Sequence, residues 1–488
     1  MKFGRGFPAC LVALAFVGGC AAAAKSPPAS VAEYDRLGKT QGQSYPRQTI
    51  VMYNIQRVLD GDLKAEDRVN SMQLVAALGS DDPLVRRNLA ALLADPKCPP
   101  TLFRGVLEYL LKNDYPELAG YVARALPQVG QQGPLRDAVL EWLGKHPEPA
   151  VLAEVVKLWA QEPSATGINE PKFRQVVEKI SNKFWDAALL ESLNTPDFFA
   201  RGSAIDILSA RMAPTALREQ IMKMTARTEA ISALQAVSIR FEYMPVSASG
   251  LLAVVSIYKT RPDALEDAAK LSRSWSADYG YRFDIRDFHL LASLSRDPLR
   301  KLLKRDQLIL ELGQATDLKN RPHAPWHAGR EDRFWPQAEG LSMGDLWNLY
   351  LLNEMLSRPL VQTSIQLMAE HDRADRSSVW GGLIFYENGR AEARLYPASK
   401  EAGENDMGYM PSRTLIVEGR DSLCRFYGHF EALRNARRAG PTAEELQEAK
   451  VNDYYGLVLT TLDETSFTAH YYNPQGVVVS LGVFPFTK

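Results

Sequence analysis

Between residues 73 and 160 the apolar positions follow a helical period, and the whole pattern recurs every 33 residues. Each recurrence opens with a proline, at Pro83, Pro116 and Pro149. Proline is tolerated at the first position of a helix because its missing N–H would have no partner there. The positions that superpose behind the three prolines are Val85, Leu118 and Val151; Leu89, Val122 and Val155; Ala90, Ala123 and Val156; and Leu93, Leu126 and Trp159. The same interval upstream relates Leu74, Leu107 and Leu140, and also Ala77, Leu110 and Leu143. Each repeat therefore predicts two helices, and the three together predict stacked helical hairpins.

Helical periodicity continues after these repeats, so residues 48–318 are predicted to form one all-α solenoid. The further helices expected are Lys172–Leu193, Asp197–Ala226, Glu229–Phe241, Ser249–Tyr258, Asp263–Arg273 and Asp284–Leu312. A single hairpin has too little apolar surface to fold alone, so stacking buries a shared core and leaves a long face free. This face could bind a protein partner, or the region could serve only as a spacer.

Strand-like alternation replaces the helical period in the last third of the chain. Residues 344–488 open with an amphipathic helix from Gly344 to His371, which Pro359 can interrupt. The strands expected after it are Trp380–Tyr386, Ala391–Tyr396, Thr414–Glu418, Leu423–Phe430, Tyr455–Thr461, Ser466–Tyr472 and Val477–Val483. One short helix, Pro441–Glu448, begins with the spacing of a capping box, Thr442 followed by Glu445. The predicted fold class is thus a multidomain chain, a helical-repeat solenoid followed by a smaller α+β domain with a mixed or mostly antiparallel sheet.

Residues 319–343 separate the two predicted domains and are rich in proline and aromatic side chains. His323 and His327 lie four residues apart, a spacing that zinc ligands often have on a helix. Pro325 lies between them and disfavours a helix, so packing between domains is the preferred interpretation of this linker.

The first twenty residues have the composition of a targeting segment. Lys2 and Arg5 precede a short apolar run that ends at Val17-Gly18-Gly19-Cys20. This arrangement resembles a bacterial lipoprotein signal, which implies that Cys20 is lipidated and becomes the mature N-terminus; a secretory signal cut within the following alanines is the alternative. Ala21 implies an outer-membrane destination in a cell that has one, and residues 21–47 would form a flexible tether. The localisation expected is the cell envelope, lipid-anchored on the periplasmic side of the outer membrane if the cell is Gram-negative.

The turn before Pro83 resembles one found in HEAT repeats. In Asp81-Asp82-Pro83-Leu84-Val85-Arg86 an aspartate would cap the second helix, and the arginine would pack against the neighbouring repeat. The other two repeats keep only the proline. The solenoid is therefore described as HEAT-like, with a tetratricopeptide array as the alternative because its period is close.

A second resemblance covers residues 344–488. The strand ending at His429, the following Glu431, and Gly440-Pro441-Thr442 leading to Glu445 are similar to the core of the JAB/MPN metallopeptidases. In that family two histidines and an aspartate hold zinc, a serine stabilises the oxyanion, and an upstream glutamate activates the bound water. The resemblance implies His429, Glu431 and Glu445 as metal ligands and Thr442 on the oxyanion side. At the place of the glutamate this chain has Ser378 or Val379, with Asp375 and Glu387 nearby in sequence.

Composition adds two restrictions. The 488 residues carry a formal net charge of -1, which gives no general attraction to nucleic acid, and no phosphate-binding or dinucleotide-binding loop occurs. The preferred interpretation is that no cofactor is bound, with zinc as the alternative, and Cys98 and Cys424 are too far apart in sequence to suggest a disulfide framework. Two functions remain: a lipid-anchored scaffold that binds an envelope protein and carries a non-catalytic JAB-like domain, or a zinc-dependent peptidase or amidase.

Overall fold

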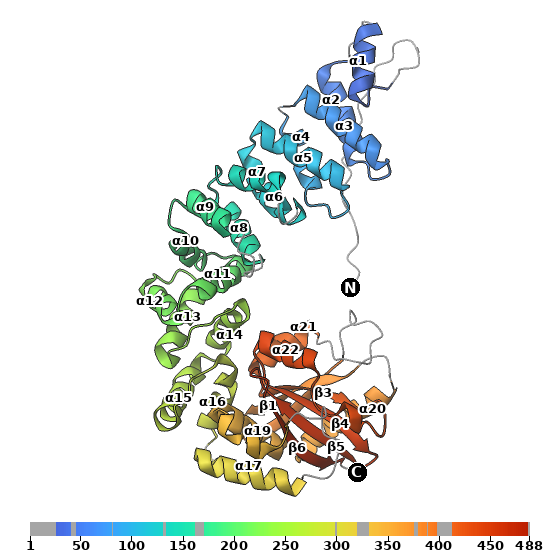
Figure 1. The fold of residues 1–488 in the computed structure, drawn as a ribbon. Helices are drawn as coiled ribbons and strands as arrows, with labels where there is room; N and C mark the ends of the chain where they lie inside the picture. Colours follow the sequence, from blue (N-terminus) through green and yellow to red (C-terminus); the bar gives the residue numbers. More distant parts are fainter. Residues whose placement is uncertain are drawn as a thin grey trace. The chain divides into compact units, whose positions relative to one another are not determined.

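The computed structural model describes residues 26–40, 45–80, 82–129, 133–161, 170–297, 300–319, 331–374, 379–387, 389–397 and 412–486. The chain divides into two compact units (Figure 1). The first comprises Met1–Leu158 with Ile168–Asn182, and the second comprises Trp159–Gly167 with Lys183–Lys488.

Helices alone form the described part of the first unit. They are α1 (Val31–Thr40), α2 (Arg47–Leu59), α3 (Ala65–Leu78), α4 (Pro83–Leu92), α5 (Pro100–Asn113), α6 (Ala119–Ala125), α7 (Pro134–Leu143), α8 (Pro149–Gln161) and α9 (Glu170–Ser181). Consecutive helices pair with each other, α2 with α3 and α4 with α5. The two pairs contact each other through α2 with α4 and through α3 with α5. The side chains of the superposed apolar positions are buried, apart from that of Ala77, which is exposed.

The repeat starts are confirmed with one variation. Pro83 opens α4, where the Asp82 side chain accepts a hydrogen bond from the Leu84 N–H at 2.9 Å, and Pro149 opens α8. Pro116 instead opens a short 3-10 turn ahead of α6. Arg86 contacts the next hairpin as expected, through an ion pair with Glu117 at 2.8 Å and its position 4.4 Å from the centre of the Tyr115 ring.

The second unit starts with further helices. These are α10 (Trp185–Ser192), α11 (Phe198–Arg211), α12 (Pro214–Lys223), α13 (Glu229–Phe241), α14 (Ala248–Thr260), α15 (Leu265–Tyr279), α16 (Phe288–Ser295) and α17 (Arg305–Lys319). Three predicted helices are each divided in two: Lys172–Leu193 into α9 and α10, Asp197–Ala226 into α11 and α12, and Asp284–Leu312 into α16 and α17. Asn182 at the first break has a positive φ of 54°, a backbone conformation that ends a helix.

A six-stranded mixed sheet follows in the same unit. Two short elements, α18 (Phe334–Gln337) and a 3-10 turn, lead into α19 (Met343–Met355) and α20 (Pro359–Ala374). The strands are β1 (Gly381–Glu387), β2 (Arg390–Tyr396), β3 (Cys424–His429), β4 (Gly456–Asp463), β5 (Ser466–Tyr472) and β6 (Val478–Pro485), in the spatial order β2-β1-β3-β4-β5-β6. Only β3 and β4 pair in parallel, and α22 (Ala443–Asn452) connects them.

The prediction of a strand at Thr414–Glu418 is wrong, because Arg413–Glu418 forms a helix, α21. The Ser412 hydroxyl accepts a hydrogen bond from the Leu415 N–H at 3.2 Å, and the Ser412 carbonyl accepts one from the Ile416 N–H at 3.1 Å. These local bonds favour a helical turn over the extended form that the short alternation suggested.

Helices α16 and α17 pack against strands of the sheet, so helices ahead of the predicted linker belong to the same compact unit as the strands (Figure 1). The carbonyl of Tyr386 on β1 accepts hydrogen bonds from His289 at 3.1 Å and Ser293 at 2.7 Å, both on α16. The Tyr386 hydroxyl in turn donates to Asp297. Residues 320–330 lie outside the described residues, so the role of that linker stays a prediction.

Candidate functional site

The residues predicted to bind metal lie around the crossover that joins β3 to β4. His429 is the last residue of β3, where its backbone pairs with Thr460 of β4. Glu431 lies just after the strand. Thr442 and Glu445 lie in the first turn of α22, so the topology brings the start of this helix toward the strand end.

The two carboxylates already have partners within the chain. Glu431 accepts a hydrogen bond from the Asn435 side-chain amide at 2.6 Å and forms an ion pair with Arg438. Glu445 accepts from the backbone N–H of Thr442 at 2.6 Å, and the Thr442 hydroxyl accepts from the Glu445 N–H at 3.2 Å. This is a complete capping box, in which both side chains satisfy backbone donors at the start of α22.

Burial controls the protonation of His429 and Glu445. Desolvation lowers the pKa of His429 to about 4, with the Glu431 charge opposing and the Arg438 charge adding to the shift, so the imidazole is neutral at pH 7. Its ring lies 5.6 Å from the ring of Tyr427, and its Nδ1 has no hydrogen-bond partner among the described residues. Desolvation raises the pKa of Glu445, and interactions with Tyr427 and Thr442 oppose that rise.

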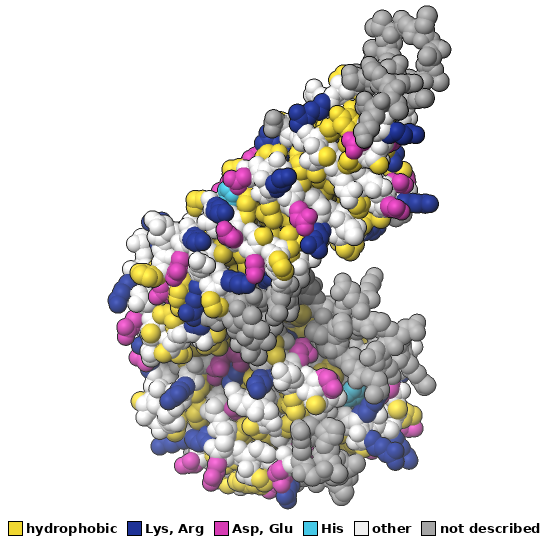
Figure 2. Space-filling model, turned by 45° about the horizontal axis from the view of Figure 1, so that its top comes forward, with side chains coloured by type: hydrophobic (Ala, Val, Ile, Leu, Met, Phe, Trp, Pro, Cys, Tyr) yellow, Lys and Arg dark blue, Asp and Glu magenta, His cyan; other side chains and the backbone are white. Residues whose placement is uncertain are grey.

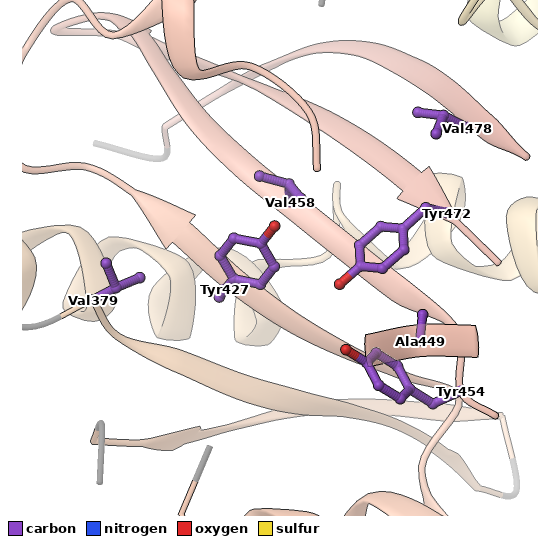
Figure 3. Close-up of a cluster of buried hydrophobic side chains, with 7 residues drawn as sticks. All are labelled: Val379, Tyr427, Ala449, Tyr454, Val458, Tyr472 and Val478. Carbon is purple, nitrogen blue, oxygen red and sulfur yellow. The ribbon is translucent and has the colours of Figure 1, made fainter. Parts of the chain in front are cut away.

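The resemblance to JAB/MPN metallopeptidases would place a catalytic glutamate just before β1, and the sheet register shows which residues lie there. The Trp380 carbonyl accepts a hydrogen bond from the Gly428 N–H at 3.1 Å, so the residues just before β1 lie beside the end of β3. Val379 is buried there in a cluster with Tyr427, Ala449, Tyr454, Val458, Tyr472 and Val478 (Figure 3). Glu387 lies at the other end of β1 and pairs with Arg261 at 2.9 Å, whereas Ser378 and Asp375 lie outside the described residues.

Within the described parts of the chain, no group of three or more His, Cys, Asp and Glu side chains is arranged to hold a metal ion. The zinc site at His429, Glu431 and Glu445 stays a prediction. Cys20, His323 and His327 lie outside the described residues, and Cys98 and Cys424 are free thiols. No described helix combines the length and apolar character that crossing a bilayer requires.

A buried charged cluster that the sequence did not indicate joins the helices of the second unit to the sheet. Asp287, at the start of α16, accepts hydrogen bonds from the hydroxyls of Tyr281 at 2.7 Å and Tyr455. Arg286 pairs with Asp284 at 3.2 Å and with Asp453, at the end of α22. Asp345 on α19 accepts from Tyr471 at 2.7 Å and Asn473 at 2.9 Å.

Beside this cluster the second unit contains a cleft of about 1080 Å³. One wall comes from residues 243–253 around the start of α14 together with Asp284–Arg286. The opposite wall comes from residues 416–425 at α21 and β3 and from α22, with the turn at residues 474–476 completing it. Because these segments are far apart in sequence, no local pattern could have predicted the cleft.

Charged side chains of both signs are interspersed over the face shown in Figure 2. That face therefore presents no continuous basic surface.

No protein-family model, no curated protein and no solved structure matches this chain.

Proposed function

We propose that this protein is a lipid-anchored adaptor of the cell envelope. Its helical hairpins form a HEAT-like solenoid that binds a protein partner, and its JAB/MPN-like C-terminal domain is non-catalytic. Cys20 carries the lipid, which holds the chain at the outer membrane if the cell is Gram-negative.

One observation carries the proposal. In each unit, side chains contact residues that lie about one repeat, roughly 33 residues, away in the sequence. In the first unit, Arg86 pairs with Glu117, and the side chain of Gln128 donates to the Leu93 carbonyl at 3.1 Å. Lys172 pairs with Asp137 at 2.5 Å. Each of these contacts joins one hairpin to the next, which is the pattern of a stacked array.

The second unit has the same spacing. The Arg227 N–H donates to the Asn194 side chain at 3.2 Å, 33 residues away, and Arg273 donates to the Arg240 carbonyl at 3.4 Å, also 33 residues away. Arg296 pairs with Asp263 at 2.6 Å across the same interval. This spacing supports a repeat that extends beyond the three copies visible in the sequence, and stacks of that kind present long surfaces for partners.

Two phenylalanines supply candidate contact residues on this array. Phe184 at the start of α10 is 80% exposed, and Phe199 on α11 is 71% exposed and lies beside Phe198, with ring centres 5.6 Å apart. Aromatic side chains dominate the binding energy of protein interfaces, and leaving two in water is unfavourable unless a partner covers them.

A photo-crosslinking experiment tests the adaptor function. We expect p-benzoylphenylalanine placed at Phe184 or Phe199 in living cells to form a discrete adduct with one envelope protein. The matched control is the same group at Leu310 of α17, which is 53% exposed, and we expect no adduct there. The absence of an adduct at both phenylalanines, or equal labelling at all three positions, would refute the proposal.

Two further measurements test the other parts. Metabolic labelling with an alkyne fatty acid should mark the wild type and fail to mark Cys20→Ala. Protein purified without a chelator should lack stoichiometric zinc. Stoichiometric zinc that is lost in His429→Ala would instead establish the alternative, a zinc-dependent peptidase or amidase.

A further inference from the structure

Residues 26–30, which precede the first helix, are packed on the first unit. Pro28 is buried, and its carbonyl accepts a hydrogen bond from the side-chain amide of Asn54 on α2 at 2.9 Å. Asn54 is 0% exposed, and its amide also donates to the Ile50 carbonyl at 2.8 Å. The Ala29 carbonyl accepts a hydrogen bond from the hydroxyl of Ser71 on α3 at 3.4 Å, and Ser71 is buried as well. Two buried side chains from two different helices therefore hold this stretch of backbone.

The same stretch leads directly into α1. The Ser30 hydroxyl accepts a hydrogen bond from the Glu33 N–H at 3.2 Å, and the Glu33 carboxylate accepts one from the Ala29 N–H at 2.8 Å. These reciprocal bonds satisfy backbone donors at the start of α1, and α1 in turn packs on α3. Residues 28–40, the docked segment, are thus attached to both α2 and α3.

The docked segment limits how far a lipid on Cys20 can lie from the first unit. Pro28 follows Cys20 by eight residues, and eight residues span at most about 28 Å. If all of residues 21–47 acted as a free tether, as the sequence predicted, the chain could reach about 95 Å. The contacts of Pro28 and Ala29 therefore reduce the possible reach more than threefold.

The docked segment also carries a side chain that suits a membrane surface. Tyr34 on α1 is 38% exposed. Tyrosine favours the boundary between water and lipid, because its ring is apolar and its hydroxyl is polar. The part of the unit that a lipid on Cys20 would draw toward the bilayer therefore presents an aromatic side chain to it.

We propose that the surface of the first unit around α1 faces a phospholipid bilayer and is held close to it by the short chain between Cys20 and Pro28. This inference rests on the proposed lipidation of Cys20. It adds that the first helices work at the membrane surface, and not at the end of a long flexible tether.

Energy transfer in vesicles tests the distance. The full-length lipidated chain is placed in vesicles of phosphatidylethanolamine and phosphatidylglycerol that contain an acceptor dye on a lipid headgroup, and the donor dye is attached at Ala32→Cys in a Cys98→Ser background. Ala32 follows Cys20 by twelve residues, which span at most about 42 Å, so a dye pair with half transfer at about 45 Å is suitable. We expect more than half transfer. Inserting about one hundred Gly and Ser residues between Ala24 and Lys25 should lower it at least twofold, because a flexible chain of that length averages about 57 Å between its ends.

Hydrogen exchange tests the docked segment independently of the lipid. Asn54→Ala removes the bond to the Pro28 carbonyl, so amide exchange in residues 28–34 should become about tenfold faster, as expected for the loss of one buried hydrogen bond. The matched control is Asn113→Ala on α5, whose side-chain amide donates to the carbonyl four residues earlier, that of Tyr109, at 2.7 Å. It should leave the exchange of residues 28–34 unchanged. Ser71→Ala, which removes the bond to Ala29, is the second variant if Asn54→Ala does not fold.

The inference would be overturned if the vesicle-bound chain shows less than half transfer at Ala32 or if the insertion leaves the transfer unchanged. Exchange of residues 28–34 at the rate of an unfolded chain, or an equal effect of Asn54→Ala and Asn113→Ala on it, would also overturn it. A chain that fatty-acid labelling never marks would overturn the lipid anchor and this inference together. Low transfer in a chain that is labelled and bound to vesicles would overturn this inference alone, so the two failures can be told apart.

Discussion

The buried carboxyl of Asp287 makes the stability of the second unit dependent on pH in a direction that can be worked out. Desolvation raises its pKa from 3.8 to about 6, the Arg286 charge opposes the rise, and the Asp284 charge adds to it. Between these two pKa values the folded chain keeps a proton on Asp287 that the unfolded chain has lost. The stability that Asp287 contributes is therefore complete below about pH 4 and is lost as the pH rises through about 6.

Asp287→Asn removes this titration while keeping the shape of the side chain. A shift of roughly two pKa units corresponds to about 3 kcal/mol. We expect the variant to be less stable than the wild type at low pH, because one hydroxyl of Tyr281 or Tyr455 loses its preferred acceptor. As the pH rises from about 3.5 to about 7.5, the wild type should lose about 3 kcal/mol of unfolding free energy relative to Asp287→Asn.

This difference can be measured by urea titrations at several pH values. Hydrogen exchange of peptides from residues 284–295, which belong to the second unit, reports the unfolding of that unit alone. Asp278→Asn, which changes an exposed aspartate on α15, is the matched control and should give a difference that does not vary with pH. A difference between the wild type and Asp287→Asn that stays constant, or that grows as the pH rises, would show that the carboxyl is ionised in the folded state and would refute the reasoning.

Two more predictions concern packing. Gly344→Ala should destabilise the second unit by about 1–3 kcal/mol, because the added Cβ would lie 2.6 Å from the Asp287 carboxylate oxygens. Gly120→Ala on α6 should instead stabilise the first unit by about 0.5–1 kcal/mol, because its added Cβ would meet no neighbouring atom within 4 Å. Thermal unfolding followed by circular dichroism distinguishes the two signs, and equal effects would contradict the prediction. Arg86→Met should lower the stability of the first unit by about 1 kcal/mol, since it removes a partly exposed ion pair and a cation–π contact with the next hairpin, and an unchanged midpoint in urea would contradict this.

The sequence predicted the helices of the repeats and most strands because each depends on side-chain periodicity within one segment. Val85, Leu89 and their equivalents are buried because a helical stripe has only one face that can meet its neighbour. The ends of long helices were predicted less well. The break at Asn182 depends on one residue taking a left-handed conformation, and apolar periodicity contains no signal for it.

The charged cluster and the cleft could not be predicted, for a different reason. Arg286 meets Asp453, 167 residues later in the chain, and only the packing of α16 against the sheet brings them together. Arg420, Lys450 and Val246 also come from separate segments, and each alone has the sequence context of an ordinary surface residue. Composition gives the number of these charges but not their common place in one cavity.

The spacing of Thr442 and Glu445 shows how a local rule and a family pattern can coincide. A hydroxyl followed three residues later by a carboxylate is both a capping box and a variant of the Ser-x-x-Asp pattern of the JAB/MPN metallopeptidases. In the structure both side chains bond to the backbone of the first turn, so the need to satisfy orphaned N–H groups at the start of α22 is enough to explain the spacing. The bond to Thr442 uses Oε2 of Glu445, so a metal at this residue would have to be held through Oε1 while the cap stays intact. Because the cap explains the spacing without a metal, it supports the proposal that the domain is non-catalytic.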